Sequence, residues 1–252
     1  MSTTLAIANQ KGGVGKTTTA INLGAGLGAL ERRVLLVDCD PQGNATRGLG
    51  AVVAPPHLYN VLAGEVPLAA AIRPSGFPNL DLVPSGRDLV GIEVEFVGEE
   101  GWEGILKGRL ADVAAGYDVI LLDCPPSLGH LTVCALTAAD GVLVPLQCEY
   151  FALEGMSDLL ATVQRIQGGL NRDLTLSGIL LTMYDDRTNL SRDVADEIRR
   201  HFSDQVFETV VPRNIRLAEA PSHGLPIFQY DIKSRGAEAY LALAREVIRR
   251  AA

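Results

Sequence analysis

Residues 5–19 read LAIANQKGGVGKTTT, so a short apolar run leads into a glycine-rich turn that opens a helical pattern. Glycine lets successive backbone N–H groups turn inward, because no Cβ atom obstructs them. Those N–H groups and the positive end of the following helix then surround phosphate oxygens. A strand, a glycine-rich loop and a helix in this order are the context that a phosphate-binding loop requires. The stretch therefore predicts such a loop.

The loop supplies a cation and a hydroxyl group as well as backbone donors. Lys16 can reach the β- and γ-phosphates of a nucleotide, and the hydroxyl group of Thr17 can ligate Mg²⁺. Where the usual motif has its first glycine, this chain has Gln10, followed by a second lysine, Lys11. The predicted phosphate contacts are Lys11, Gly12, Gly13, Val14, Gly15, Lys16, Thr17 and Thr18.

Two further apolar runs end in aspartate: residues 34–40 read VLLVDCD and residues 119–126 read VILLDCPP. In an open α/β sheet the carboxyl ends of the strands border the ligand crevice. Asp38 and Asp40 point to the same side if their strand continues, because side chains alternate along a strand. The pattern alone does not rank these two carboxylates. Asp123 suits Mg²⁺, which keeps several waters and needs few protein carboxylates.

Short apolar strands alternate with helical patterns along the chain. Strands are expected at residues 5–8, 34–37, 80–83, 119–122, 142–144, 176–183 and 206–211, and helices near residues 16–30, 102–115, 154–168, 190–202 and 237–250. This alternation predicts an α/β fold with a mostly parallel, twisted sheet and helices on both faces. One domain is expected to span residues 1–252. Residues 51–79 are expected to be irregular or short-helical surface structure, and the five glutamates of residues 93–103 a solvated face.

The composition is that of a globular protein with a buried core, since 47% of the residues are apolar and 21% are charged. No apolar run approaches the roughly 18 residues of a membrane-spanning helix, and no export signal precedes the first strand. The four cysteines lack C-x-x-C spacing, so we expect small core residues rather than a metal or redox site. We therefore expect a cytoplasmic protein.

The net charge of −8 is unevenly distributed. Residues 1–160 carry 9 basic and 18 acidic side chains, whereas residues 161–252 carry 13 and 12. An acidic surface repels nucleic acid. Any polyanion is therefore expected to bind the carboxyl-terminal third.

The string KGGVGKT of residues 11–17 resembles the deviant Walker A loop of the ParA/MinD family of ATPases. The resemblance implies ATP and Mg²⁺ as cofactors and an ATP-bound sandwich dimer in which Lys11 reaches the partner's nucleotide. It also implies that Asp40 orients or activates the attacking water and that Asp123 supports Mg²⁺ as in a Walker B segment. The implied catalytic residues are Lys11, Lys16 and Asp40, and the implied magnesium ligands are Thr17, Asp40 and Asp123.

Within that family, residues 40–46, 182–185, 187–190 and 211–224 resemble chromosomal ParA (Soj) proteins. By this likeness Pro212 and Asn214 are candidate contacts to the nucleotide base, and Arg187, Arg213 and Arg216 are candidate contacts to DNA. The likeness implies a slow ATPase whose ATP-bound dimer binds non-specific double-stranded DNA on the nucleoid. A ParB-type partner would stimulate hydrolysis and so release the DNA. Arg192, Arg199 and Arg200 could add to the positive field or be salt-bridged on a solvated helix face.

Three other functions remain as alternatives. A MinD-like membrane-surface ATPase would need a basic amphipathic tail, which the sequence after the last helix does not provide. A relative of the nitrogenase iron protein would need cluster ligands, for which Cys124 and Cys134 are the candidates. A non-hydrolysing switch is opposed by the joint presence of Lys11, Lys16, Asp40 and Asp123. Because no helix-turn-helix extension is expected, the short chromosomal type is favoured over a self-repressing plasmid type.

Overall fold

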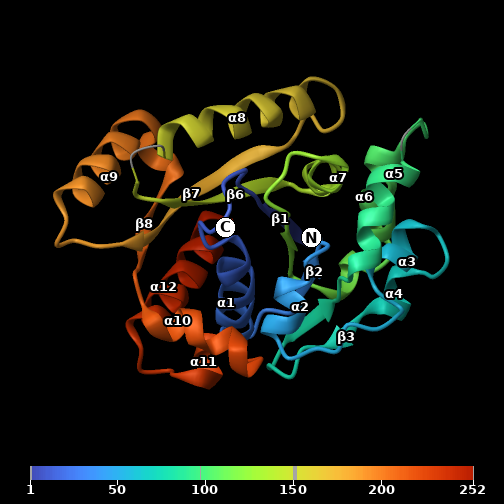
Figure 1. Ribbon diagram of the computed structural model, residues 1–252, viewed down its shortest axis with the longest axis horizontal. Coiled ribbons are helices and arrows are strands. Elements are labelled where there is room, and N and C mark those ends of the chain that lie inside the picture. Colours follow the sequence, from blue (N-terminus) through green and yellow to red (C-terminus); the bar gives the residue numbers. More distant parts are fainter. Residues whose placement is uncertain (1, 97, 150–151, 252) are drawn as a thin grey trace.

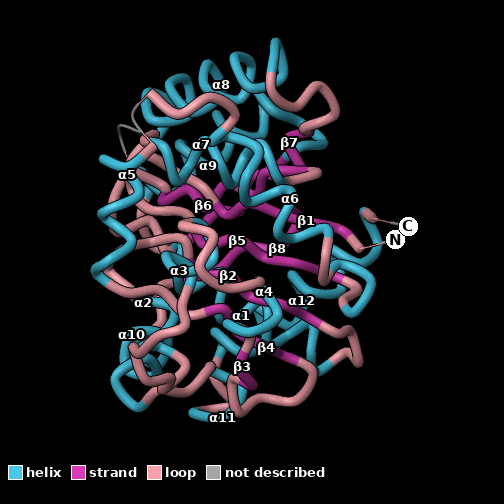
Figure 2. The backbone as a smooth tube through the Cα atoms, turned by 90° about the vertical axis from the view of Figure 1, so that its right-hand side faces the viewer, coloured by secondary structure: helices cyan, strands magenta, loops and turns pink. Residues whose placement is uncertain are grey.

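The computed structural model describes residues 2–96, 98–149 and 152–251, and its centre is one sheet with the strand order β3-β4-β2-β5-β1-β6-β7-β8. Figure 2 shows the strands following one another from β7 near the top to β3 at the bottom. The strands are β1 (Thr3–Ile7), β2 (Val34–Asp38), β3 (Arg73–Pro74), β4 (Leu80–Val83), β5 (Val119–Asp123), β6 (Gly141–Gln147), β7 (Thr175–Tyr184) and β8 (Val206–Pro212). All neighbouring strands run parallel except β3 and β4, which confirms the predicted fold class.

The helices are α1 (Lys16–Ala29), α2 (Asn44–Gly48), α3 (Leu58–Leu62), α4 (Leu68–Ala71), α5 (Ile92–Glu95), α6 (Ile105–Ala111), α7 (His130–Ala138), α8 (Ala152–Gly169), α9 (Asn189–Phe202), α10 (Ile215–Glu219), α11 (Ile227–Tyr230) and α12 (Arg235–Arg250). Short 3₁₀ turns lie at Arg87–Gly91, Trp102–Gly104, Ala114–Gly116, Ser203–Gln205 and Ala220–His223. The helices expected near residues 16–30, 154–168, 190–202 and 237–250 are therefore confirmed. No helix among the described residues combines the length and the apolar character that crossing a membrane requires.

The sheet separates two apolar clusters, because neighbouring residues of a strand face opposite sides. Leu35 and Val37 pack with residues of α3–α9, whereas Val34 and Leu36 pack with α1 and α12. In Figure 1, α8 accordingly lies on one side of the sheet (top) and α1 and α12 lie on the other (bottom). The four cysteines are free and buried, as expected of core residues.

The last helix is attached to the edge strand β8 through a buried carboxylate. Glu246, which is 4% exposed, accepts hydrogen bonds from the backbone N–H groups of Glu208 (2.8 Å) and Thr209 (3.0 Å). Arg250 also donates to Glu246, at 2.9 Å. Burial alone would raise the pKa of Glu246, but these hydrogen bonds outweigh it and the pKa is lowered.

Two expectations for residues 51–116 need correction. Residues 51–79 do contain the short helices α3 and α4, but Leu58, Val61 and Ala71 are fully buried, so this is not surface structure. The single helix expected near residues 102–115 is α6 flanked by two 3₁₀ turns. The sequence pattern missed these features because α3, α4 and α6 have only 5, 4 and 7 residues, which is too short to show a helical period.

The glutamates of residues 93–103 are also not all solvated, since Glu93 accepts hydrogen bonds from the backbone and the ring of His130 (3.1 and 2.7 Å). Glu93 thereby holds the first turn of α7. That helix was missed because most of its residues are buried apolar or small ones, and it lacks the polar face that reveals a surface helix.

Candidate functional site

The adjacent strands β2, β5 and β1 bring the predicted residues to one edge of the sheet. Asp38 at the end of β2 pairs with Asp123 at the end of β5, which in turn pairs with Ile7 at the end of β1. The loop of residues 8–15 leaves β1 at this edge and opens α1. The carboxyl ends of parallel strands therefore gather the glycine loop and both aspartate segments, as the sequence predicts.

The glycine loop presents backbone donors that have no partner in the described part of the chain. Gly13 and Gly15 have φ angles of 76° and 90°, which other residues rarely adopt. Among the residues that the structure describes, none accepts a hydrogen bond from the N–H groups of Gly12, Gly13 or Gly15. The first turn of α1 also has neither a side-chain cap nor an acidic residue. Its free N–H groups and the helix dipole therefore favour an anion.

Lys16 lies inside this loop rather than in solvent. Lys16 is only 7% exposed, and its Nζ atom donates to the carbonyl oxygen of Lys11 at 3.1 Å. Burial lowers the pKa of Lys16, while Asp123 and Asp40 act in the opposite direction. A buried ammonium group with one neutral hydrogen-bond partner retains donors for an anionic ligand.

Asp123 is fully buried, and neither of its carboxylate oxygens has a hydrogen-bond partner in the described part of the chain. Burial raises the pKa of Asp123 well above its usual range and the charge of Asp38 adds to this, whereas Thr17 and Lys16 partly offset it. A buried polar group without a partner is costly, so this arrangement indicates a site that binds a ligand.

The donor set fits Mg²⁺. Within the described residues, no three His, Cys, Asp or Glu side chains could hold a metal ion by themselves. Mg²⁺ is commonly held by one or two carboxylates, waters and phosphate oxygens. The carboxylate of Asp123 beside the hydroxyl group of Thr17 would suit as the protein's share of such a shell.

The structure distinguishes the aspartate that ends β2, Asp38, from the one that follows it, Asp40. Asp38 accepts hydrogen bonds from the backbone N–H and hydroxyl groups of Thr46 (2.8 and 2.7 Å) and from the N–H group of Asp40 (3.2 Å). Asp40 accepts one from Gln42 through Oδ1 (2.9 Å), and no described group donates to Oδ2. The strand ends at Asp38, so its alternation does not extend to Asp40. Both oxygens of Asp38 therefore accept hydrogen bonds within the chain, whereas Asp40 keeps one oxygen without a donor among the described residues.

Ser85 supports Asp40 and was not found from the sequence. Its hydroxyl group donates to the carbonyl oxygen of Asp40 at 2.7 Å, and its own N–H group donates to the hydroxyl oxygen of Thr46 at 2.9 Å. All these groups are buried. No local sequence pattern marks Ser85, because it joins the site only through the pairing of β4 with β2.

Lys11 is held away from the loop by a carboxylate that was also not predicted. Its ammonium group forms an ion pair with Glu149 (2.8 Å), and its backbone N–H group donates to the side chain of Asn9 (2.9 Å). The Lys11 and Glu149 side chains are 38% and 46% exposed. Lys11 is therefore accessible from outside the loop, on the side facing the segment after β6.

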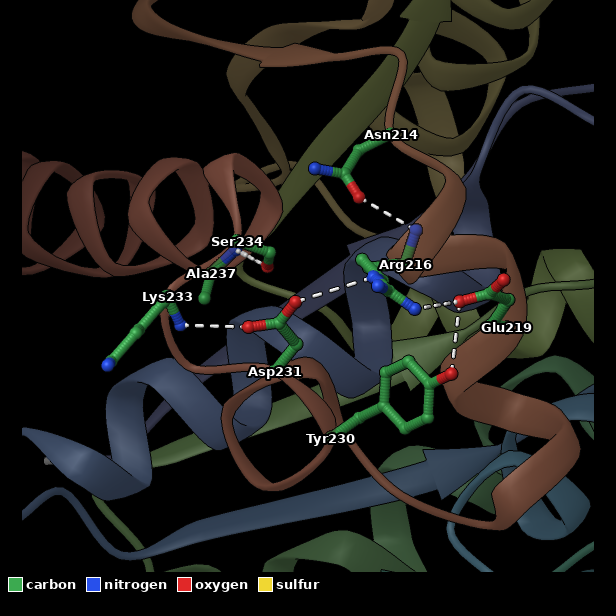
Figure 3. Close-up of polar contacts among 8 residues, drawn as sticks. All are labelled: Asn214, Arg216, Glu219, Tyr230, Asp231, Lys233, Ser234 and Ala237. Carbon is green, nitrogen blue, oxygen red and sulfur yellow. Dashed lines mark hydrogen bonds and ion pairs between the residues drawn. The ribbon is translucent and has the colours of Figure 1, made fainter.

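The candidate base contacts lie at the far end of the sheet. Pro212 ends β8, three positions from β1 in the strand order, and Asn214 follows it. The side-chain oxygen of Asn214 caps α10 by accepting from the N–H group of Arg216 at 2.8 Å (Figure 3). The amide NH₂ group of Asn214 donates to no described residue and is left for a ligand.

The candidate DNA contacts are only partly brought together. Arg187 and Arg213 line one groove, with Pro212, Ile215 and Arg235. Arg187 makes two hydrogen bonds of 2.8 Å to Asp185, whereas the side chain of Arg213 has no hydrogen bond or ion pair with any described residue.

Arg216 does not line that groove. Figure 3 shows it between Glu219 (2.9 Å) and Asp231 (3.5 Å), with Tyr230 donating to the same Glu219 oxygen at 3.0 Å. This cluster ties α10 to the end of α11. Arg216 is therefore held by two carboxylates within the chain, unlike Arg213.

Comparisons with known proteins give consistent results. Residues 2–176 match the family described as "AAA domain". The chain is 54% identical to the chromosome partitioning protein ParA of Myxococcus xanthus, with 98% of this chain and 88% of the relative aligned. It is 53% identical to the sporulation initiation inhibitor protein Soj of Bacillus subtilis, with 98% of each aligned.

Solved structures share the fold over nearly the full chain. A protein from Mycobacterium smegmatis titled cobyrinic acid a,c-diamide synthase, with bound ADP and magnesium, is 41% identical and has a TM-score of 0.87 over 99% of this chain and 95% of its own. The septum site-determining protein MinD of Pyrococcus horikoshii, complexed with Mg-ADP, is 27% identical and has a TM-score of 0.82 over 100% and 98%.

Proposed function

This chain belongs to the ParA/MinD family of P-loop ATPases, and we propose that it is a chromosome- or plasmid-partitioning ATPase that acts as one domain over residues 1–252. The observation that carries the proposal is the buried, unpaired carboxylate of Asp123 beside Lys16 and a loop with free N–H groups. ATP with Mg²⁺ satisfies all three needs at once, since it brings phosphate oxygens to the donors and a cation to the carboxylate.

Each residue then has a defined task. The N–H groups of residues 12–18 and the ammonium group of Lys16 bind the phosphates, while Thr17 and Asp123, aided by Asp40, hold the metal. Mg²⁺, when bound, neutralises the charge that develops on the phosphate oxygens. The free Oδ2 of Asp40 accepts a hydrogen bond from the water that attacks the γ-phosphorus, which orients that water.

We extend the proposal to assembly. In an ATP-bound sandwich dimer Lys11 contacts the partner's phosphates, for which it exchanges its exposed ion pair with Glu149. This exchange costs little, because an exposed ion pair stabilises a protein by only about 0–1 kcal/mol.

Non-specific DNA binding by this dimer, on the nucleoid in the cytoplasm, completes the proposal. Arg213 is available for phosphate contacts, and Arg187 beside it becomes available when it leaves Asp185. Two copies of the groove would double the number of released counterions, which strengthens binding of a polyanion by an acidic protein. A ParB-type partner stimulates the slow hydrolysis and so ends DNA binding. Pro212 and the amide group of Asn214 contact the base.

The experiment is binding to unspecific duplex DNA with MgATP and with MgADP over a salt series, together with phosphate release. Asp40→Ala holds the ATP state. We expect salt-sensitive DNA binding with ATP alone and slow hydrolysis that a ParB-type protein accelerates. Binding to anionic vesicles but not DNA would favour the MinD-like alternative. ATP consumption that depends on cobyrinic acid would favour the activity named for the M. smegmatis protein. No nucleotide binding would refute the proposal as a whole.

A further inference from the structure

The carboxyl end of β7 contacts the phosphate loop through Thr182 and Val14. The hydroxyl group of Thr182 donates to the carbonyl oxygen of Val14 at 2.8 Å, across 168 residues of sequence. Thr182 is 2% exposed, and a Cβ atom added to Gly15 would lie 3.9 Å from its methyl group. The contact is therefore a buried one between a distant strand and the loop that opens α1.

This hydrogen bond fixes the orientation of one peptide unit. The carbonyl group of Val14 and the N–H group of Gly15 belong to the same planar trans peptide, so they point in opposite directions. Because Thr182 holds the carbonyl group, the N–H group of Gly15 points away from β7, toward the open side of the loop. That N–H group donates to none of the residues described.

The backbone of β7 is irregular next to this contact. Met183, the next residue, has a φ angle of 50°, which is uncommon for any residue except glycine. The pairing of β7 with β8 also changes register between Leu181 and Tyr184. Backbone irregularities of this kind persist where the surrounding structure requires them, and they are frequent at functional sites.

We propose that Thr182 is a positioning residue for nucleotide binding, which acts by holding the Val14–Gly15 peptide so that the Gly15 N–H group faces a phosphate oxygen. The inference rests on the proposed nucleotide site, because it assigns Thr182 to the same loop. A glycine peptide with free rotation would lose conformational freedom on binding, and Thr182 removes that cost before the nucleotide arrives.

The decisive variants are Thr182→Val, which keeps the shape and removes the hydroxyl group, and Thr182→Ser, which keeps the hydroxyl group. Titration calorimetry with MgADP measures the phosphate contact without dimer formation. We expect about tenfold weaker binding for Thr182→Val, in line with the loss of the hydrogen bond from the Gly15 N–H group to a charged phosphate. Thr182→Ser should stay within about twofold of the parent protein. In hydrolysis assays the KM for ATP should rise for Thr182→Val while kcat is retained.

Thr175→Val is the matched control. It removes a hydroxyl group from the other end of β7, where Oγ1 donates to the carbonyl oxygen of Asp140 at 3.2 Å. MgADP affinity should be unchanged in this variant. Circular dichroism confirms folding, and Thr182→Ala replaces Thr182→Val if the latter does not fold.

Equal MgADP affinity for Thr182→Val and Thr182→Ser would overturn the inference, as would an equal loss in Thr175→Val. If the parent protein binds no MgADP, the nucleotide site itself is refuted, and the inference falls with it. Normal binding by the parent and by Thr182→Val refutes only the inference.

Discussion

The phosphate loop and the arginine-bearing segments around β8 differ in how their polar groups are satisfied. At the loop, the buried carboxylate of Asp123 has two unpaired oxygens, and the N–H groups of the less buried Gly13 and Gly15 have no acceptor among the described residues. Near β8 the groups are exposed, and two of the three candidate arginines already have carboxylate partners. Leaving buried polar groups unpaired is costly, whereas exposed ion pairs change stability little. The unpaired groups of the first region therefore indicate a ligand site, whereas only the positive charge of the arginines indicates a binding surface in the second.

The largest expected effect concerns Asp40, because its free oxygen is the only one at the site assigned to water. Asp40→Ala should lower kcat for ATP hydrolysis by roughly 100-fold or more, a typical loss for a group that assists proton transfer. ATP affinity should change little, since Lys16 and the loop remain. Phosphate release under saturating MgATP measures this. Hydrolysis within a few-fold of the parent protein would show that another group orients the water.

Asp123→Asn distinguishes the effect of this carboxylate on the stability of the free protein from its effect on nucleotide binding. Without nucleotide, the variant's free energy of unfolding should equal or slightly exceed that of the parent, because the cost of burying the carboxylate outweighs its interactions with Thr17 and Lys16. With MgATP at about 100 times the dissociation constant, the parent gains about 2.7 kcal/mol and the variant should gain far less. Thermal melting with and without MgATP gives both values. A large loss of stability in the nucleotide-free variant would contradict the assignment.

Glu246 provides the opposite case, a buried carboxylate with partners. Glu246→Gln should lower the free energy of unfolding by about 1–3 kcal/mol, because the amide NH₂ group would face a backbone N–H donor. The lowered pKa of Glu246 means that its contribution is present above pH 4.5, its ordinary value, and is lost as the pH falls further. Denaturant unfolding should be measured from about pH 3 to about pH 7. The free energy of unfolding of the variant should fall less steeply with decreasing pH than that of the parent. An unchanged slope would exclude Glu246 as the cause.

The smallest effects are expected at the arginines. Arg213→Ala should reduce the slope of log K against log salt for DNA binding by about 1 for each copy in contact.

Asp185→Asn should tighten DNA binding about two- to fivefold, because it releases Arg187 from an exposed ion pair. Arg216→Ala should leave the slope unchanged, since Glu219 and Asp231 already occupy that side chain. A slope change as large as that of Arg213→Ala would return Arg216 to the DNA surface.

The sequence predicts those parts of the site that depend on local rules. The glycine loop, Lys16 and the aspartates at strand ends follow from residue spacing and from the position of strand ends in a parallel sheet. Ser85, Glu149 and Thr182 could not be found in this way, because each reaches the site only after the strands have paired. The same distinction applies to the fold. Long amphipathic helices such as α12 were predicted, and α7 was not, because its burial leaves no periodic signal.

The shortest strand, β3, limits how molecules of this protein can associate. A sheet edge with free backbone groups invites another strand, which leads to continuous sheets and aggregation. At this edge β3 has two residues, and one of them is Pro74, which has no N–H group to offer. The sheet is therefore terminated against lateral growth on this side. In the proposed sandwich dimer, two molecules pair through the strand ends, where the nucleotide loop lies, so that pairing depends on a small ligand rather than on backbone hydrogen bonds between sheet edges.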